Sequence, residues 1–300
     1  MAVLATASPG WNLSPPLLLE AAAVVLAYGF RARSLSRRGR PVPGWRQGCF
    51  YVGIALLLVA LLSPVDTIGE SRLFWVHMVQ HLLIGDLAPL LILLGLSGPI
   101  LRPVLAVAPF ARLRVLASPF VALPIWVLVF YGWHVPPMYE AALDNGFVHG
   151  LEHVSFFTAG MLMWAAVIEP VPGPAWFGAG AKAAYVLLVR TFAAVLASVF
   201  IWAGEPLYPV YRGGERIWGI SPLADQQIGG AIMFVEGATV TLIVFAWLFL
   251  RWEREAEQRQ SLLDSGVDPR VAMRTARYGR RAPAPSRSAP PPEAPGRPVG

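Results

Sequence analysis

The chain of 300 residues is 56% hydrophobic and 14% charged. An ordinary soluble domain carries about 25% charged residues, so this composition excludes a typical water-soluble protein. The formal net charge is +6. Because the basic residues gather in short segments between apolar stretches, we attribute the excess to anionic membrane lipids and expect no nucleic-acid partner. The single cysteine, Cys49, excludes an internal disulfide and any CxxC metal or redox motif.

Seven apolar stretches are long enough to cross a bilayer, which takes roughly 20 residues. They cover residues 14–31, 48–64, 74–97, 119–135, 148–168, 183–203 and 228–250. The sequence therefore predicts an all-α, polytopic membrane helix bundle of about seven transmembrane helices, formed by residues 1–252. The N-terminus lacks the basic region of a secretory signal, so we expect the first helix to be retained. Residues 253–300 are predicted to be a Pro/Ala/Arg-rich tail, largely disordered.

The basic residues of the connecting loops predict the orientation. Ten of them lie on one side of the predicted membrane and three on the other. The larger set is Arg31, Arg33, Arg37, Arg38, Arg40, Arg46, Arg102, Arg112, Arg114 and Lys182, and the smaller is Arg72, Arg212 and Arg216. Because cytoplasmic loops are enriched in Lys and Arg, we expect the N-terminus outside and the C-terminal tail in the cytoplasm.

All five histidines fall at the outer ends of three predicted helices. His77 and His81 begin the third helix, His134 ends the fourth, and His149 and His153 begin the fifth. Each i, i+4 pair shares one helix face, and all five lie within roughly 8 Å of the outer interface. Neutral imidazole is the commonest protein ligand for late first-row metals. The pattern therefore predicts a metal site at the outer face.

Copper is the predicted metal and cofactor, since imidazole suits Cu(II) and thioethers add affinity for Cu(I). Residues at the same predicted level are candidates for additional ligands or for acceptors of imidazole hydrogen bonds. They are the thioethers Met78, Met138 and Met233 and the polar residues Asp225, Gln226 and Glu236. Glu152 is expected to point roughly 60° to 100° away from its neighbours His149 and His153, which argues against a ligand role.

Other kinds of site use similar residues. The run HGLEH (149–153) matches H-x-x-E-H, an inverted zinc-protease signature in which Glu152 is the general base. HxxxH pairs also mark membrane di-iron oxygenases, which need more histidines than this chain has. A b-type cytochrome would place its histidines deeper, and a transporter would need a polar path across the membrane. A membrane metalloenzyme or a b-type haem redox protein using the same histidines is the alternative interpretation.

Two ionisable residues lie deep inside predicted spans. Asp86 is roughly 13 Å and Arg190 roughly 10 Å from the inner end of its helix. Their matching depth and opposite charge predict a structural ion pair. Pro89 should free the carbonyl of Gly85 and kink the third helix there.

The segment of residues 204–227 is long and rich in Tyr, Trp, Pro and Gly. Long loops without structure of their own are uncommon in compact proteins. We therefore expect this segment to lie along the interface as a lid or docking surface.

Four motifs together resemble the CtaG family, multi-span assembly factors of caa3-type cytochrome c oxidase. They are HMVQHLLIGDLAPLLILLG (77–95), WHVPPMYEAAL (133–143), HGLEHVSFFTAGMLMWAAVI (149–168) and DQQIGGAIMF (225–234). The resemblance covers most of positions 50–250 and includes the five histidines and Asp225. It implies a non-enzymatic chaperone in the bacterial plasma membrane that serves the respiratory chain. Cytochrome c oxidase subunits would be its partners, with copper insertion as the step it assists.

Overall fold

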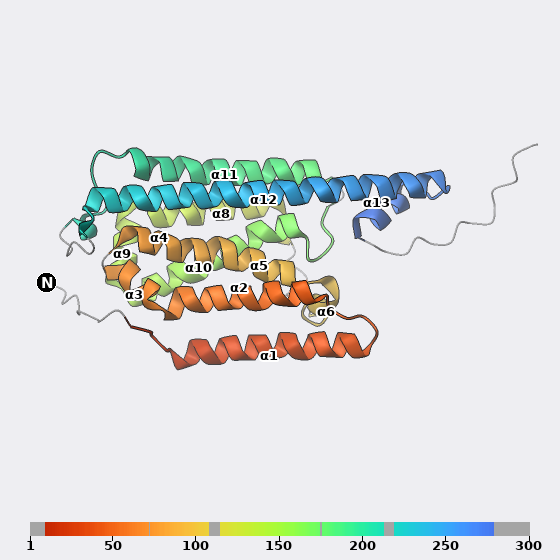
Figure 1. Ribbon diagram of the computed structural model, residues 1–300, viewed down its shortest axis with the longest axis horizontal. Coiled ribbons are helices and arrows are strands. Elements are labelled where there is room, and N and C mark those ends of the chain that lie inside the picture. Colours follow the sequence, from red (N-terminus) through yellow and green to blue (C-terminus); the bar gives the residue numbers. More distant parts are fainter. Residues whose placement is uncertain (1–9, 72, 108–114, 175, 213–218, 279–300) are drawn as a thin grey trace, which may run out of the picture. The chain divides into compact units, whose positions relative to one another are not determined.

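The computed structural model describes residues 10–71, 73–107, 115–174, 176–212 and 219–278, and every regular element in these ranges is a helix. The first half holds α1 (Pro15–Arg37), α2 (Gly44–Leu62), α3 (Pro64–Ser71), α4 (Phe74–Leu82), the π-helical turn η1 (Leu83–Leu87), α5 (Ala88–Gly95) and α6 (Gly98–Leu105). The second half holds α8 (Pro119–His134), α9 (Pro136–Asp144), α10 (Gly146–Ile168), α11 (Ala179–Trp202), the short 3-10 helix η3 (Pro209–Tyr211), α12 (Pro222–Asp264) and α13 (Pro269–Tyr278). The predicted all-α fold is confirmed (Figure 1).

Among the described residues, six helices are long and apolar enough to cross a membrane: α1, α2, the continuous rod Phe74–Gly95, α10, α11 and α12. The pair α8 and α9 would make a seventh span, but the chain bends by 73° between them. The bend follows from the sequence, because two prolines, Pro136 and Pro137, come directly after the end of α8. Helices usually end before a proline. The expectation of about seven spans is thus confirmed as six to seven.

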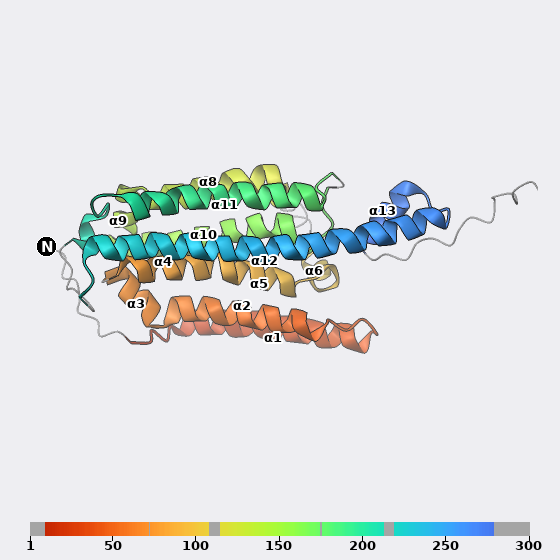
Figure 2. The same ribbon diagram turned by 45° about the horizontal axis from the view of Figure 1, so that its top comes forward.

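The bundle of the first compact unit, residues 1–244, is built around α10. This helix packs against α8 on one side and against η1 and α5 on the other, while α2 covers α5 (Figures 1 and 2). Two adjacent glycines bring α12 close to its neighbours. A Cβ on Gly229 would lie 2.6 Å from the ring of Phe74 in α4, and a Cβ on Gly230 would lie 2.8 Å from the carbonyl oxygen of Ala197 in α11.

The break in the third span is a π-helical turn rather than a simple proline kink. It occupies Leu83–Leu87, directly before α5, which has Pro89 in its first turn. The Gly85 carbonyl of this turn meets α10, because a Cβ on Gly160 would lie only 2.0 Å from the Gly85 oxygen. Only glycine permits so close an approach of two backbones. The turn and α10 therefore interlock at this point.

Residues 245–300 form a second compact unit. Within it α12 continues to Asp264, where Arg251 Nε donates to Glu255 Oε1 at 2.5 Å, and α13 follows. Residues 253–264 and 269–278 are therefore helical, although they belong to the tail expected to be largely disordered. Residues 279–300, the most Pro-rich part of that tail, lie outside the described residues, as do Arg72, Arg112, Arg114 and Arg216.

Candidate metal centre

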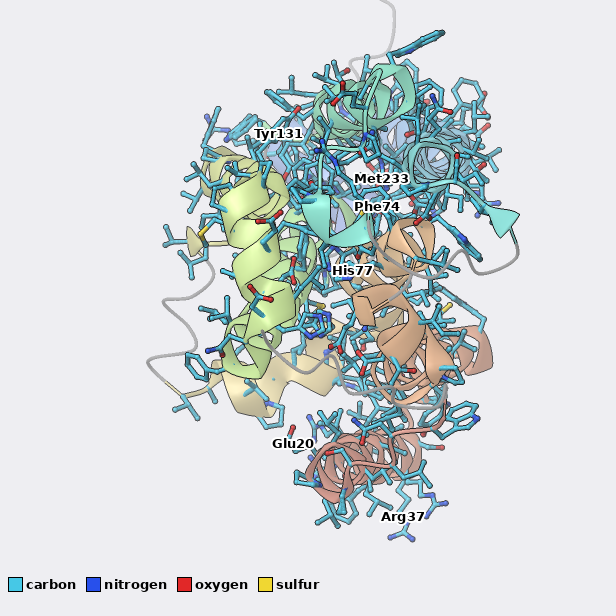
Figure 3. The ribbon with its side chains drawn as sticks, turned by 90° about the vertical axis from the view of Figure 1, so that its left-hand side faces the viewer. Glu20, Arg37, Phe74, His77, Tyr131 and Met233 are labelled. Atoms are coloured by element: carbon cyan, nitrogen blue, oxygen red, sulfur yellow. The ribbon has the colours of Figure 1, made fainter. Side chains whose placement is uncertain are left out.

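Three helices bring the five histidines together at the end of the bundle where α3 and α9 lie (Figure 1). His77 and His81 come from α4, His134 from the last turn of α8, and His149 and His153 from the first turns of α10. All five are buried. Ring centroids lie 5.8 Å apart for His77 and His149, and 6.0 Å apart for His81 and His153. Figure 3 shows His77 inside the bundle, while Glu20 and Arg37 of α1 lie on its outside.

The tightest group of metal-ligating atoms comes from His77, His149 and Glu152. One ligand atom from each of these residues lies within 4.8 Å of the other two. Two ligand atoms about 2 Å from one tetrahedral metal ion lie about 3.3 Å apart, so side-chain rotations would have to bring these three atoms closer together to hold one ion. His149 Nε2 already lies 4.0 Å from Glu152 Oε2.

Glu152 is completely buried, with 0% of its surface exposed. Neither carboxylate oxygen has a hydrogen-bond partner among the described residues. The expectation that Glu152 points away from the site is therefore wrong. A residue 60° to 100° from His149 on an isolated helix still points inward here, because α10 is packed by α8, η1 and α5 on several sides.

Glu70, which the sequence reasoning missed, fixes the orientation of His149. Its Oε1 accepts a hydrogen bond from His149 Nδ1 at 2.5 Å. A carboxylate behind a ligating imidazole selects the tautomer and leaves Nε2 free for the metal. The only sequence signal was a carboxylate seven residues before His77, in a segment read as a loop. The structure places it on α3, which packs against α4.

His77 and His81 contact each other directly. Their Nε2 atoms lie 2.7 Å apart, and His81 Nε2 is also 3.5 Å from Glu152 Oε1. A neutral imidazole carries one N–H, so one of the two Nε2 atoms donates and the other accepts. His81 therefore lies at the border of the triad. The His153 ring lies beside the His149 ring, tilted by 57°, with 4.0 Å between the ring centroids.

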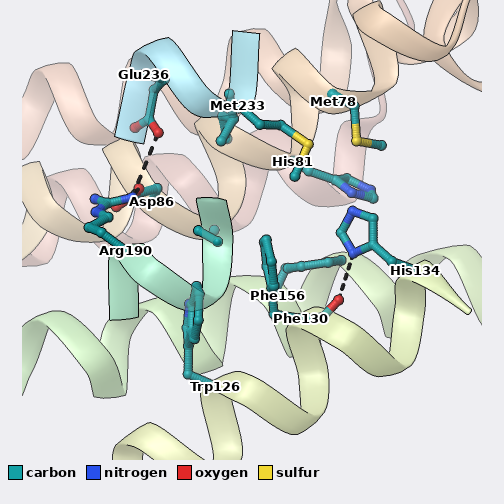
Figure 4. Close-up of a pocket in the computed structure, with 13 residues that line it drawn as sticks. Met78, His81, Asp86, Trp126, Phe130, His134, Phe156, Arg190, Met233 and Glu236 are labelled. Atoms are coloured by element: carbon teal, nitrogen blue, oxygen red, sulfur yellow. Dashed lines mark hydrogen bonds and ion pairs between the residues drawn. The ribbon is translucent and has the colours of Figure 1, made fainter. Parts of the chain in front are cut away.

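His134 stands apart from the triad and faces a cavity. Its Nδ1 donates to the Phe130 carbonyl at 2.6 Å, which leaves Nε2 without a hydrogen-bond partner in the described part of the chain. The cavity measures about 40 Å³. Its walls include Met78, His81 and Met233 together with His134 (Figure 4).

The far wall of the same cavity carries a buried ionic cluster. Arg190 Nη1 donates to Asp86 Oδ2, and Trp164 Nε1 donates to Asp86 Oδ1 at 2.6 Å. Glu236 Oε2 lies 3.7 Å from Arg190 Nη1. The structure thus brings Asp86 and Arg190 into contact. Glu236 of α12, which the sequence placed near the histidines, lies beside Asp86 and Arg190 (Figure 4).

The structure gives three other expected site residues different surroundings: Asp225 and Gln226 accept hydrogen bonds from backbone N–H groups, and Met138 is partly exposed. Asp225 accepts hydrogen bonds from the backbone N–H groups of Phe74 at 2.8 Å and Trp75 at 2.9 Å. Gln226 Oε1 accepts from the Leu207 N–H at 2.6 Å. The first N–H groups of a helix have no partner within the helix, so the side-chain oxygen of Asp225 accepts from them at the start of α4. Met138 is 45% exposed on α9, beyond the 73° bend.

Two tyrosines from the described part of the segment of residues 204–227 contact the helices that carry the histidines or precede them. Tyr208 Oη donates to the His134 carbonyl at 2.8 Å, and Tyr211 Oη donates to the Gly69 carbonyl at 3.0 Å. Burial raises the pKa of both phenols above the usual value of 10.0, so each stays neutral as a donor. Residues 213–218, part of the expected lid, lie outside the described residues.

A polar contact links α3 to α4, the helix that carries His77 and His81. Gln80 Nε2 donates to Asp66 Oδ1 at 2.6 Å and to the Ala60 carbonyl at 3.0 Å. Burial and, to a smaller extent, the charge of Glu70 raise the pKa of Asp66 to about 6, although the Gln80 hydrogen bond and His149 oppose the shift. Neither Asp66 nor Gln80 carried a sequence signal that set it apart.

Comparison with known proteins shows which family and which proteins the chain resembles. The family described as "Cytochrome c oxidase caa3 assembly factor (Caa3_CtaG)" matches residues 26–255. Uncharacterized protein Mb0105 of Mycobacterium bovis is 27% identical over 270 residues, which cover 84% of this chain and 41% of that protein. Uncharacterized protein MT0111 of Mycobacterium tuberculosis shows the same values.

Uncharacterized protein ML1998 of Mycobacterium leprae is 25% identical over 282 residues, or 87% of this chain and 40% of that protein. The chain thus spans about two fifths of the length of these relatives. No solved structure matches the chain. The family match takes in every helix that carries a histidine, and on this ground the chain belongs to the cytochrome c oxidase caa3 assembly factor family.

Proposed function

We propose that this protein helps to mature a caa3-type cytochrome c oxidase by holding copper at the His77–His149–Glu152 triad and passing it to an oxidase subunit. The observation that carries the proposal is the Glu152 carboxylate, which is fully buried with no hydrogen-bond donor among the described residues. A buried, unpaired carboxylate costs several kcal/mol. A metal cation bound between it and two imidazoles supplies the missing charge.

The donor set supports a divalent first-row metal. Two imidazole nitrogens and one carboxylate oxygen suit Cu(II) and also Zn(II). Bound copper would be cargo that moves from the ligands of this chain to those of an oxidase subunit. The residues of this chain would bind and position it until transfer. Glu70 orients His149, while Asp225 secures the start of α4, three residues before His77.

We also propose a cellular location and a membrane orientation for the protein. The distribution of basic residues favours a bacterial plasma membrane with the N-terminus and the metal centre on the outside and the C-terminal tail in the cytoplasm. We retain residues 1–252 as the membrane domain and residues 253–300 as the tail. We propose a role as a chaperone for the oxidase without catalysis of its own, and membership of the assembly-factor family supports it.

The test is metal binding and oxidase maturation in matched variants of the full chain. Glu152→Gln removes the charge of the buried carboxylate, whereas Glu205→Gln removes the charge of a loop glutamate whose side chain is 84% exposed. We expect Glu152→Gln to weaken copper binding at least tenfold and to lower oxidase activity in the membrane, and Glu205→Gln to change neither. Copper affinity in Glu152→Gln equal to wild type would end the proposal, and a Soret band in the purified protein would favour haem instead.

A further inference from the structure

We infer that the cavity beside the triad is a second metal position, one that selects a soft monovalent cation such as Cu(I) through His134, Met78 and Met233, with His81 on its border. This inference rests on the proposed metal-handling function. It assigns a separate ligand set and a separate oxidation state to a second site.

The first observation is the free nitrogen of His134. Its Nδ1 is occupied by the Phe130 carbonyl, so the Nε2 lone pair has no donor in the described structure although the residue is only 6% exposed. Leaving a buried acceptor without a partner is costly. The backbone hydrogen bond also fixes the tautomer, which is how ligating imidazoles are usually held.

The second observation is that two buried thioethers from different helices line the same cavity. Met78 of α4 is 1% exposed and Met233 of α12 is 5% exposed. Gly229 lets the helices approach at this point, since a Cβ there would lie 3.3 Å from Met78 Cγ, and Met233 follows one helical turn later. Figure 4 shows both methionine side chains beside the His81 ring, with His134 next to it.

This ligand set differs chemically from the triad. Thioether sulfur is a soft donor that selects Cu(I) over Zn(II) and over hard cations, while the imidazole and carboxylate of the triad suit divalent ions. Methionine often serves only to fill gaps in a core. Here the two sulfurs share a cavity with an unpaired imidazole nitrogen, which core filling does not require.

The cavity has the room and the charge for a cation. Its volume of about 40 Å³ exceeds the 10–15 Å³ or so that a single water needs. Arg190 is the one arginine or lysine among the described residues that line the cavity. Arg190 is paired with Asp86, and Glu236 lies 3.7 Å away from it. The wall therefore carries no net positive charge that would repel a metal ion.

His81 connects the two positions. Its Nε2 lies 2.7 Å from His77 Nε2 and 3.5 Å from Glu152 Oε1, and its ring also lines the cavity. A metal ion at either position would thus have an imidazole that reaches toward the other. Two sites of different softness, joined in this way, would let one protein hold both oxidation states of copper.

The test uses two metals that do not change oxidation state in the assay. Ag(I) probes the soft site and Co(II) probes the triad, each titrated into the purified full-length protein in detergent against a competing chelator. Met78→Leu combined with Met233→Leu preserves side-chain volume and removes both sulfurs. The matched control is Met163→Leu, an equally buried methionine of α10 that does not line the cavity.

We expect the double variant to bind Ag(I) at least tenfold more weakly with Co(II) binding unchanged, and Met163→Leu to bind both as wild type does. Glu152→Gln should show the reverse, losing Co(II) and keeping Ag(I). Unchanged Ag(I) affinity in the double variant would overturn the soft site and leave the triad standing. Unchanged Co(II) affinity in Glu152→Gln, with weaker Ag(I) binding in the double variant, would overturn the triad and leave the soft site standing.

A second measurement does not depend on how well the double variant folds. Wild-type protein labelled with selenomethionine and loaded with Cu(I) should show selenium in the first coordination shell by X-ray absorption. Nitrogen and oxygen neighbours alone in that spectrum would contradict the inference.

Discussion

Glu70 accepts a hydrogen bond from His149 at 2.5 Å, and this contact joins the short helix α3 to the first turn of α10. The carboxylate is partly exposed, yet it determines which nitrogen of a buried imidazole faces the triad. The geometry at the metal centre thus depends on a residue that is not itself in the group of ligand atoms.

Glu70→Gln should therefore weaken copper binding by about 10- to 100-fold, the usual effect of removing a partner behind a ligating histidine. Because Glu70 is near the surface, the thermal midpoint of the metal-free protein should change little. Titration of the purified variant gives the first quantity and detergent-phase melting the second. Glu20→Gln on the exposed face of α1 is the control, and equal copper affinity in Glu70→Gln and Glu20→Gln would exclude this role.

Gly160→Ala should destabilise the protein strongly. The new Cβ would lie 2.0 Å from the Gly85 oxygen, so α10 and the π-helical turn would have to separate. Overpacking of this kind costs about 1–3 kcal/mol or more. Gly150→Ala on the same helix meets no atom within 4 Å and should be neutral or slightly stabilising. Melting curves of the two variants in detergent compare them directly, and equal midpoints would contradict the close contact.

Arg190→Leu should lower the amount of folded protein in the membrane, because it leaves the buried Asp86 carboxylate without its cation. Removing one partner of a buried pair costs about 3–5 kcal/mol. Asp86→Asn combined with Arg190→Gln should recover part of the loss, since a neutral pair needs less desolvation. Quantitative immunoblots of membranes give the yields, with Arg33→Leu on exposed α1 as the control. A double variant no better than Arg190→Leu would contradict the pairing.

Asp66 should make the stability of the metal-free protein depend on pH. Its folded pKa of about 6 lies above the usual 3.8, so the folded protein binds the proton more tightly than the unfolded chain. The associated stability is complete below pH 3.8 and is lost as the pH rises through about 6. Asp66→Asn keeps an oxygen for Gln80 and should flatten this part of the profile. Melting from about pH 4 to about pH 7 with a chelator present tests this, and parallel profiles would refute it.

The sequence allowed the fold and the histidine group to be predicted, because both follow from patterns along single helices. Apolar length marks the spans, and the i, i+4 spacing puts His77 with His81 and His149 with His153 on common faces. The depth argument also put Asp86 and Arg190 at one level, where the structure brings them into contact.

Relations between helices could not be predicted in the same way. The helix period predicts the angle of Glu152 from His149 on an isolated helix, but the inward direction of Glu152 depends on how α10 packs against α8, η1 and α5. The level of Asp225 along its helix predicts an imidazole partner, whereas its carboxylate accepts hydrogen bonds from the backbone N–H groups of Phe74 and Trp75 at the start of α4. Glu70 belongs to no sequence motif, because its role depends on one contact between two helices that are far apart in the sequence, α3 and α10.

The π-helical turn at Leu83–Leu87 controls which residues of the third span share a face. In a regular α-helix, residues five apart point about 140° away from each other. A π-helical turn instead stacks residue i on residue i+5. His81 and Asp86 are five apart and both line the cavity, so this one wide turn lets a single rod present an imidazole to the metal centre and a carboxylate to Arg190. If the same five residues formed a regular α-helical segment instead, Asp86 would point about 140° away from His81 and away from its partner Arg190, while His77 and His81 kept their places.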